Sequence, residues 1–154
     1  MKRYLSLRTS ILSQFTSIQL PALREEAITH TLAVCDACII LAKHRHLDGE
    51  LCAVAALLHD IAIFIYNCPH LGHAEKSAKY AKAYLQSTDF SANECQTILK
   101  AIQSHSDKEK KGDPISECLK DADILARYLQ DLQIPAEANR RHRLIQICKE
   151  LSIL

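Results

Sequence analysis

An imidazole and a carboxylate stand side by side in the most apolar stretch of the chain. They are His59 and Asp60, and every other residue from Leu51 to Ile65 is apolar. An ionised carboxylate removed from water is strongly destabilising unless it is paired, hydrogen-bonded or bound to a metal. The pair therefore predicts that other side chains, or a cation, compensate Asp60.

Three further histidines fall on the inner faces of predicted helices. His30 lies on the apolar stripe of one helix, His73 on a face of a second and His105 on the apolar stripe of a third. A single such histidine is more often a core residue than a ligand, but three of them together with His59 favour one shared site. The other histidines lie in helix breaks or polar surroundings, where we expect surface positions: His44, His46, His70 and His142.

A second pair of carboxylates lies in the segment "KDADIL", from Lys120 to Leu125. At 100° per residue, Asp121 lies nearer than Asp123 to the apolar stripe of the same helix. Periodicity is too weak to choose between the two acids. It predicts one inward carboxylate from this helix.

These imidazoles and carboxylates make a mixed nitrogen and oxygen donor set, with no thiolate among them. Such a set suits a divalent transition metal, namely iron, manganese, zinc, nickel or cobalt. A carboxylate has two oxygens, so Asp60 could bridge two ions. Two ions roughly 3.5–4 Å apart would activate a water molecule and hold phosphoryl oxygens. We therefore expect one or two metal ions at His59 and Asp60.

Helical periodicity accounts for most of the chain and must position these side chains. A break at "HLDGE" precedes the apolar stretch, "NCPHLG" ends it, and "SANE" is a capping box at a helix start. The charged residues 106–114 are expected to form a solvated loop. Helices are predicted over residues 22–44, 51–65, 73–86, 92–105, 115–132 and 135–152. The expected fold is all-α, one domain over residues 1–154, built as a bundle of about six or seven helices.

Composition excludes several classes of protein. The 154 residues carry 19 basic and 18 acidic side chains, so nothing indicates a nucleic-acid surface. No apolar run fits a signal peptide or a membrane span, which makes a cytoplasmic location the expectation. The seven cysteines are expected to be reduced and packed, including Cys35 and Cys38 of the one CxxC. The oligomeric state is not determined, which leaves a homodimer open.

The ordered set of motifs resembles the HD-domain superfamily of metal-dependent phosphohydrolases, whose signature is H…HD…D on a helical bundle. The matching pieces are "AITHTLAV", "AALLHDIA" and "KDADILARYL", and the likeness extends over about residues 27–130. "HAEKSAKYAKAYL" and "ILKAIQSH" are similar to a subgroup with two additional histidines, which includes bacterial enzymes that split diadenosine tetraphosphate. The resemblance implies one metal held by His30, His59, Asp60 and Asp123. It implies a second held by Asp60, His73 and His105.

One position departs from the family pattern. Many members carry a lysine three residues after the HD aspartate, thought to meet the substrate phosphate, and here that position is Ile63. Another cation must then serve, or the substrate differs. Candidates are Lys76, Lys79 and the "KEKK" run at residues 108–111, although a solvated surface charge is the simpler interpretation of each.

The function implied is hydrolysis of a phosphoester or phosphoanhydride, with a nucleotide as the expected small-molecule substrate. His59, Asp60 and Asp123 would be catalytic through a metal-activated water. Two alternatives use the same fold: an HD-type di-iron oxygenase, and a module that binds a nucleotide or metal without turnover. Fold arguments do not separate these three functions.

Overall fold

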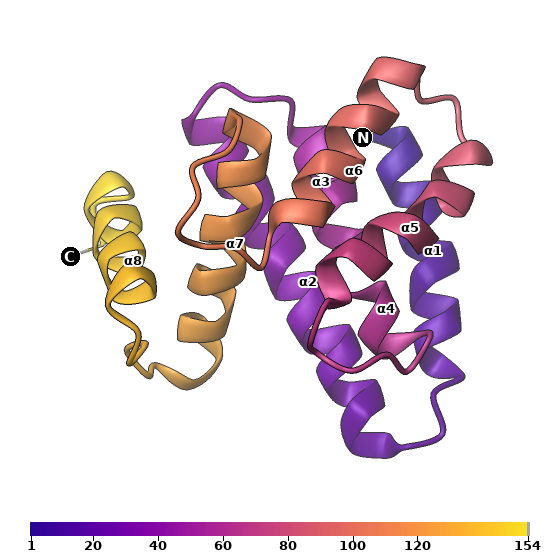
Figure 1. The fold of residues 1–154 in the computed structure, drawn as a ribbon, viewed down its shortest axis with the longest axis horizontal. Helices are drawn as coiled ribbons and strands as arrows, with labels where there is room; N and C mark the ends of the chain where they lie inside the picture. Colours follow the sequence, from indigo (N-terminus) through magenta and orange to yellow (C-terminus); the bar gives the residue numbers. More distant parts are fainter. Residues whose placement is uncertain (154) are drawn as a thin grey trace.

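The computed structural model describes residues 1–153, and every regular element in this part of the chain is a helix (Figure 1). The prediction of an all-α fold is confirmed. Two helices were not expected, one at the N-terminus and one that results from a break in the apolar stretch. The helices are α1 (Lys2–Thr16), α2 (Pro21–His44), α3 (Gly49–Leu58), α4 (Ile61–Phe64), α5 (His73–Gln86), α6 (Ala92–Ser104), α7 (Pro114–Asp131) and α8 (Ala138–Glu150).

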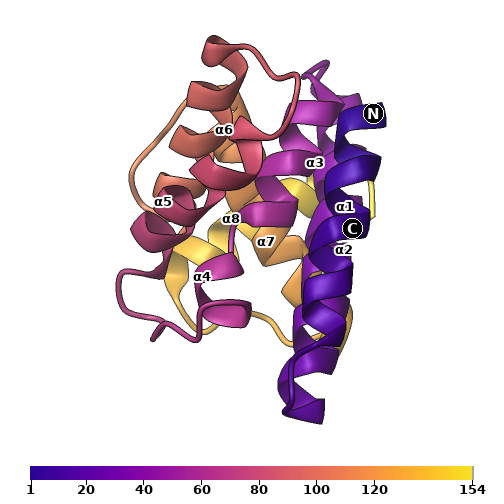
Figure 2. The same cartoon turned by 90° about the vertical axis from the view of Figure 1, so that its right-hand side faces the viewer.

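Helix α3 is the centre of the bundle. It packs against α1, α2, α6 and α7 (Figures 1 and 2), and every residue from Leu51 to Leu58 is buried. The Asp48 side chain starts the helix by accepting hydrogen bonds from the backbone amides of Glu50, at 2.9 Å, and Leu51, at 3.1 Å. The all-round apolar pattern of this segment is explained by its surroundings, since other helices cover all of its faces.

The prediction of one unbroken helix over residues 51–65 is wrong at its middle. Helix α3 ends at Leu58, and α4 begins only at Ile61. Asp60 leaves the helical conformation, with φ −115° and ψ 15°, and its carbonyl accepts from the backbone amides of Ile63 and Phe64. The break falls at the two polar residues, so it changes the direction of the chain where His59 and Asp60 must reach other helices.

The N-terminal helix and the cysteines complete the core. In α1, Tyr4, Leu7, Ile11 and Phe15 form a buried stripe at helical spacing. Cys35 and Cys38 are fully buried, and all seven thiols are free, as expected. The capping box at Ser91 and Glu94 forms as predicted. No described helix is long and apolar enough to cross a membrane.

The expectation of a fully solvated loop over residues 106–114 is wrong for one side chain. Lys108 is only 4% exposed, because the Asp107 carboxylate accepts from the amides of Glu109 and Lys110 and so turns the chain tightly around it. The Arg143 side chain of α8 also donates to the Lys108 carbonyl, at 2.9 Å. This segment is anchored on α7 and α8, and it directs an ammonium group into the bundle.

Candidate metal centre

Asp60 lies at the middle of a cluster of four histidines. Its Oδ2 is 3.2 Å from His59 Nε2 and 3.6 Å from His30 Nε2. Its Oδ1 is 3.1 Å from His73 Nε2 and 3.3 Å from His105 Nε2. One carboxylate thus presents a separate oxygen to each of two histidine pairs, which is the geometry of a bridging ligand.

Within each pair the two imidazoles meet through the same kind of atom. Nε2 of His30 is 3.3 Å from Nε2 of His59, and Nε2 of His73 is 3.0 Å from Nε2 of His105. Helices α2, α5 and the end of α6 each bring one of these rings to the break after α3. The candidate ligand atoms form two compact groups: His30 with His59 and Asp60, and Asp60 with His73 and His105.

Backbone carbonyls determine how three of the rings are protonated. Nδ1 of His59 is 2.6 Å from the Ala56 oxygen, and Nδ1 of His105 is 2.7 Å from the Ile102 oxygen. Nδ1 of His73 makes the same contact with His70, at 2.6 Å. A carbonyl oxygen only accepts, so each of these Nδ1 atoms carries a proton and Nε2 is the ring nitrogen that faces Asp60. Nε2 atoms this close to one another and to a carboxylate require protons or metal ions between them.

Asp123 completes the cluster from α7. Its Oδ1 is 3.4 Å from His30 Nε2, while its Oδ2 accepts a hydrogen bond of 2.7 Å from the Lys108 ammonium. Lys108 therefore orients the carboxylate and leaves Oδ1 facing His30. Three buried atoms of the cluster have no hydrogen-bond partner among the described residues: His30 Nδ1, Asp60 Oδ1 and Asp123 Oδ1.

Asp121, the other acid of "KDADIL", faces away from the cluster. Its carboxylate forms ion pairs with Arg45 and Arg143, both at 2.8 Å. The two acids are two residues apart on α7, so their side chains point to different sides of the helix. The structure therefore places Asp123, the acid implied by the family resemblance, at the cluster, and it gives Asp121 a structural position between α2 and α8.

Both site carboxylates remain ionised despite their burial. Burial by itself raises the pKa of Asp60, but favourable interactions with the imidazoles of His59, His105 and His30 outweigh it and hold this pKa well below its usual range. Burial has the same effect on Asp123, and the Lys108 ammonium outweighs it, so that pKa is also low. Burial lowers the pKa of His105, which favours its neutral, metal-binding form. The cluster thus keeps anionic ligands and a neutral imidazole.

A cavity of about 360 Å³ opens onto the cluster. Asp60, His73, His105 and Asp123 lie at its base, and Arg127 of α7 and Arg140 of α8 line its walls. The remaining lining residues are His70, Ser106 and Glu137. A small molecule in this cavity would contact the candidate metal ligands and two guanidinium groups at once.

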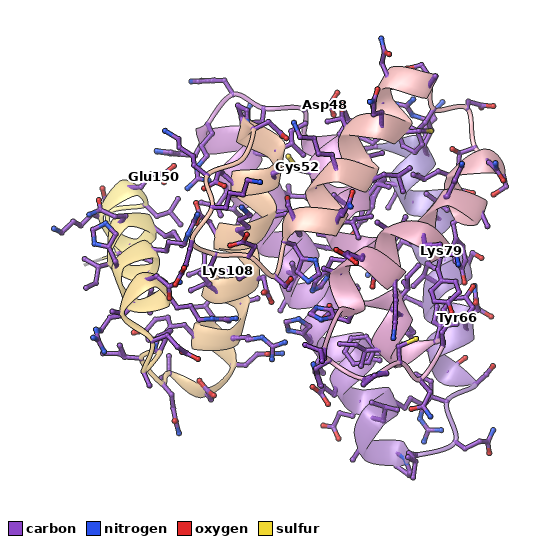
Figure 3. All side chains as sticks on the ribbon, viewed as in Figure 1. Asp48, Cys52, Tyr66, Lys79, Lys108 and Glu150 are labelled. Carbon is purple, nitrogen blue, oxygen red and sulfur yellow. The ribbon has the colours of Figure 1, made fainter. Side chains whose placement is uncertain are left out.

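Of the lysines predicted as substrate-binding candidates, only Lys108 lies at the site. Lys76 and Lys79 are exposed on α5 and do not line the cavity; Figure 3 shows Lys79 at the right of the view, away from Lys108, which lies left of centre beside α7. Ile63 is buried in α4 and does not line the cavity either. Lys108 was considered only as one member of a charged run, yet its ammonium contacts the site.

Two arginines that line the cavity, Arg127 and Arg140, were not predicted from the sequence. Arg127 is four residues after Asp123 and so lies on the same face of α7, a spacing that could have identified it. Arg140 lies near the start of α8, beyond any motif, and no pattern in the sequence places it near His30 or Asp60. Its position depends on how α8 folds back against α7.

The residues present fit divalent transition metals. The cluster offers imidazole nitrogens and carboxylate oxygens, the donor set that iron, manganese, zinc, nickel and cobalt accept. Unpartnered buried oxygens and converging Nε2 atoms are what a cation would satisfy. The peptide carbonyls that hold Nδ1 of His59, His73 and His105 are the outer partners that metal-ligating histidines commonly have.

Comparison with known proteins agrees with this arrangement. The family profile of the HD domain matches residues 27–128. A crystal structure of a predicted HD superfamily hydrolase from an uncultured Thermotogales bacterium has a similar fold, with a TM-score of 0.65 and 23% sequence identity. The similarity covers 96% of this chain and 87% of that one. The search of curated proteins found no match.

The identity to the solved structure is low, so that likeness concerns the fold alone. The family profile instead covers more than half of the 154 residues, including both ends of the H…HD…D series from His30 to Asp123. The chain belongs to the HD-domain family.

Proposed function

We propose that this protein is a metal-dependent phosphohydrolase that cleaves a phosphoester or phosphoanhydride of a nucleotide. The observation that carries the proposal is the position of Asp60, whose two oxygens each face a different pair of histidine Nε2 atoms. Membership of the HD family and the hydrolase-like fold support it.

In this proposal His30, His59, Asp60 and Asp123 hold one ion, and Asp60, His73 and His105 hold a second. When bound, divalent ions supply a water of lowered pKa and neutralise the charge that develops on phosphoryl oxygens. Asp123 is oriented for this role by Lys108, which occupies its Oδ2.

The protein side chains have further tasks around the reacting group. Burial of the cluster strengthens every electrostatic interaction there, because little water screens it. Arg127 lies on the cavity wall, with Nε 3.5 Å from Asp123 Oδ1. In the proposed reaction Arg127 supplies positive charge in place of the family lysine, because this chain has isoleucine at position 63.

The test combines metal content with phosphate release. Protein without a histidine tag would be analysed by mass spectrometry as wild type, as Asp60→Asn and as Asp36→Asn. Asp36 is exposed on α2, away from the cavity, so it controls for the charge change. We expect one or two transition-metal ions per chain, phosphate release from at least one member of a nucleotide panel, and loss of both in Asp60→Asn alone.

Other outcomes would overturn the proposal. Metal-loaded protein that releases no phosphate from any nucleotide would favour the binding module. Bound iron with an absorbance change under O₂, again without phosphate release, would favour the oxygenase. Protein that binds no transition metal under any loading condition would remove the basis of the proposal.

A further inference from the structure

The cavity at the Asp60 cluster adjoins a second cavity with a more apolar lining. The second cavity has a volume of about 300 Å³ and shares Arg127, Glu137 and Arg140 with the first. Its other lining residues are Ile124, Tyr128, Ile134, Pro135 and Ala136, with Asp131 and Gln133 as the polar members. We name it the apolar cavity, because most of the lining that it does not share with its neighbour is hydrocarbon or aromatic and none of it is imidazole.

The turn between α7 and α8 builds this apolar cavity. Leu132 ends α7 in the left-handed conformation, with φ 58°, and its amide donates to the Tyr128 carbonyl at 2.7 Å. The chain then passes Ile134 and Pro135 before α8 begins. Ile134 is 65% exposed, so an apolar side chain at this cavity remains open to solvent.

The two arginines at the junction are free to bind an anion. Among residues 1–153, the Arg140 guanidinium has no hydrogen-bond or ion-pair partner. The Arg127 side chain is 47% exposed, and its closest polar contacts are 3.5 Å from Asp123 Oδ1 and from His30 Nε2. Both of those atoms are candidate metal ligands, so a metal would satisfy them without the arginine. Guanidinium groups match phosphate oxygens in charge and geometry.

We propose that Arg127 and Arg140 bind the phosphoryl group of the substrate, and that the organic group attached to it enters the apolar cavity against Tyr128 and Ile134. This inference rests on the proposed phosphohydrolase function and names the residues that would bind the phosphoryl group and the organic group of its substrate. The preferred substrates would be phosphates of an aromatic or nucleoside group, rather than inorganic polyphosphates. Concave sites of this kind combine an apolar wall with a few placed polar groups.

Glu137 is the one carboxylate shared by the two cavities. Glu137 is exposed, and its single negative charge stands against the two positive charges of Arg127 and Arg140, which line the same two cavities. Asp60 and Asp123 are engaged by the histidines, Lys108 and the proposed metal. Two guanidinium groups against one carboxylate at the junction favour a phosphoryl group, while the hydrocarbon and aromatic side chains of the apolar cavity favour an organic group attached to it.

The experiment compares two probes that share one anionic group. Phenylphosphonate and methylphosphonate carry the same phosphonate group, but only phenylphosphonate has an aromatic ring. Because carbon is bonded directly to phosphorus in both, a phosphohydrolase does not hydrolyse them. Calorimetric dissociation constants would be measured with manganese added and again with chelator. The ratio of the two constants cancels the contribution of any metal, so it remains informative even if the protein hydrolyses nothing.

In the wild type we expect phenylphosphonate to bind about tenfold more tightly than methylphosphonate, as burial of a ring predicts. Ile134→Ser should abolish this preference without affecting methylphosphonate, and Tyr128→Ala should do the same. Ile134 is exposed, so its variant does not threaten folding. Arg140→Gln should weaken both probes by about tenfold.

Lys149→Gln is the matched control, because Lys149 is an exposed cation of the same helix α8, outside both cavities. It should leave both constants unchanged. Equal binding of the two probes to the wild type would overturn the apolar subsite. Equal effects of Arg140→Gln and Lys149→Gln would overturn the anion clamp, leaving only a general attraction by positive charge.

Discussion

Asp121 and Asp123 are two buried carboxylates on one helix, and they differ in what surrounds them. Asp121 is 7% exposed and Asp123 is 6% exposed. Asp121 lies between two guanidinium groups, those of Arg45 and Arg143, at 2.8 Å each. Asp123 has one ammonium on Oδ2, and its Oδ1 has no hydrogen-bond partner among the described residues.

The surroundings of each acid extend the contrast. Around Asp121, Arg45 also pairs with Glu150, and Arg143 also pairs with Glu117, so positive and negative groups alternate and the protein compensates itself. Around Asp123, four imidazoles and Asp60 bring Nε2 atoms and carboxylate oxygens together, and one oxygen of each acid has no hydrogen-bond partner among the described residues. A buried charge network that the protein satisfies indicates a structural role, whereas one that it leaves incomplete indicates a ligand. The comparison predicts opposite responses of the two regions to mutation.

The largest effect is expected for Asp60→Asn. Removal of the shared carboxylate should abolish transition-metal binding and reduce any phosphohydrolase activity by roughly 10³-fold or more, since electrostatic stabilisation of the reacting group is lost. The melting temperature of the chelated protein should fall, because the imidazoles that hold the pKa of Asp60 low lose their anionic partner. Metal analysis, phosphate release and thermal unfolding test this. Retention of metal by a folded Asp60→Asn protein would contradict the bridging role.

Asp121→Asn should show the reverse pattern. Loss of its charge leaves Arg45 and Arg143 partly buried without a common partner, which we expect to cost about 2 kcal/mol of unfolding free energy. Metal content per folded chain should not change. Urea denaturation of the chelated protein measures the loss, with Asp36→Asn as the exposed control. A variant as stable as Asp36→Asn would show that the network around Asp121 contributes little.

Lys108→Met tests whether a bound metal can replace the protein cation that compensates Asp123. In chelated protein the substitution leaves Asp123 buried without its ammonium, and we expect a loss of about 2 kcal/mol. Bound metal would compensate Asp123 instead, so the loss should shrink when manganese is added. Urea denaturation with and without metal provides the comparison. Equal losses in both conditions would mean that Asp123 is not a metal ligand.

The smallest effect concerns the acids at the edges of the Asp121 network. A hydrogen bond from Arg45 lowers the pKa of Glu150; at Glu117 burial is outweighed by hydrogen bonds from Gly112 and Arg143, and that pKa is also below the ordinary 4.5. A folded pKa below the unfolded value adds stability above pH 4.5, and this stability is lost as pH falls through the folded pKa.

The double variant Glu117→Gln and Glu150→Gln tests this pH dependence. It should be slightly less stable than wild type at pH 7, and the difference should disappear as the pH falls below 4.5. Urea midpoints of the chelated proteins at several pH values between 7 and 3 measure it. A difference that stays constant over this range would assign the effect to packing of α8 rather than to charge.

The sequence supported more of the site than of the connections around it. Apolar periodicity was sufficient to place His30 and His105 on inner faces, because each lies on a buried stripe of a regular helix. It failed at Asp60, where a helix pattern continued through residues that the structure breaks. Asp121 and Asp123 could not be separated by periodicity, because α7 is buried along most of its length and both faces carry buried acids.

The residues that surround the cavity illustrate what lay beyond prediction. Lys108 belongs to a charged run whose composition resembles a solvated loop, and only the turn at Asp107 and the carboxylate of Asp123 explain its burial. Arg140 belongs to a helix joined to α7 by a short irregular connection. No local pattern determines the angle at which such a helix returns, since that depends on packing and on ion pairs with Arg143.

By itself, the sequence determined an all-α chain with His59 and Asp60 in an apolar segment and with His30, His73 and His105 on inward helix faces, because helical spacing and the cost of burying polar groups are local properties. Helical spacing left Asp121 and Asp123 undecided, and only the family resemblance implied Asp123. The tertiary structure places Asp123 at the cluster and brings Lys108, Arg127 and Arg140 to the site. Those choices depend on which helix covers each face of α7. Only packing between segments distant in sequence determines that.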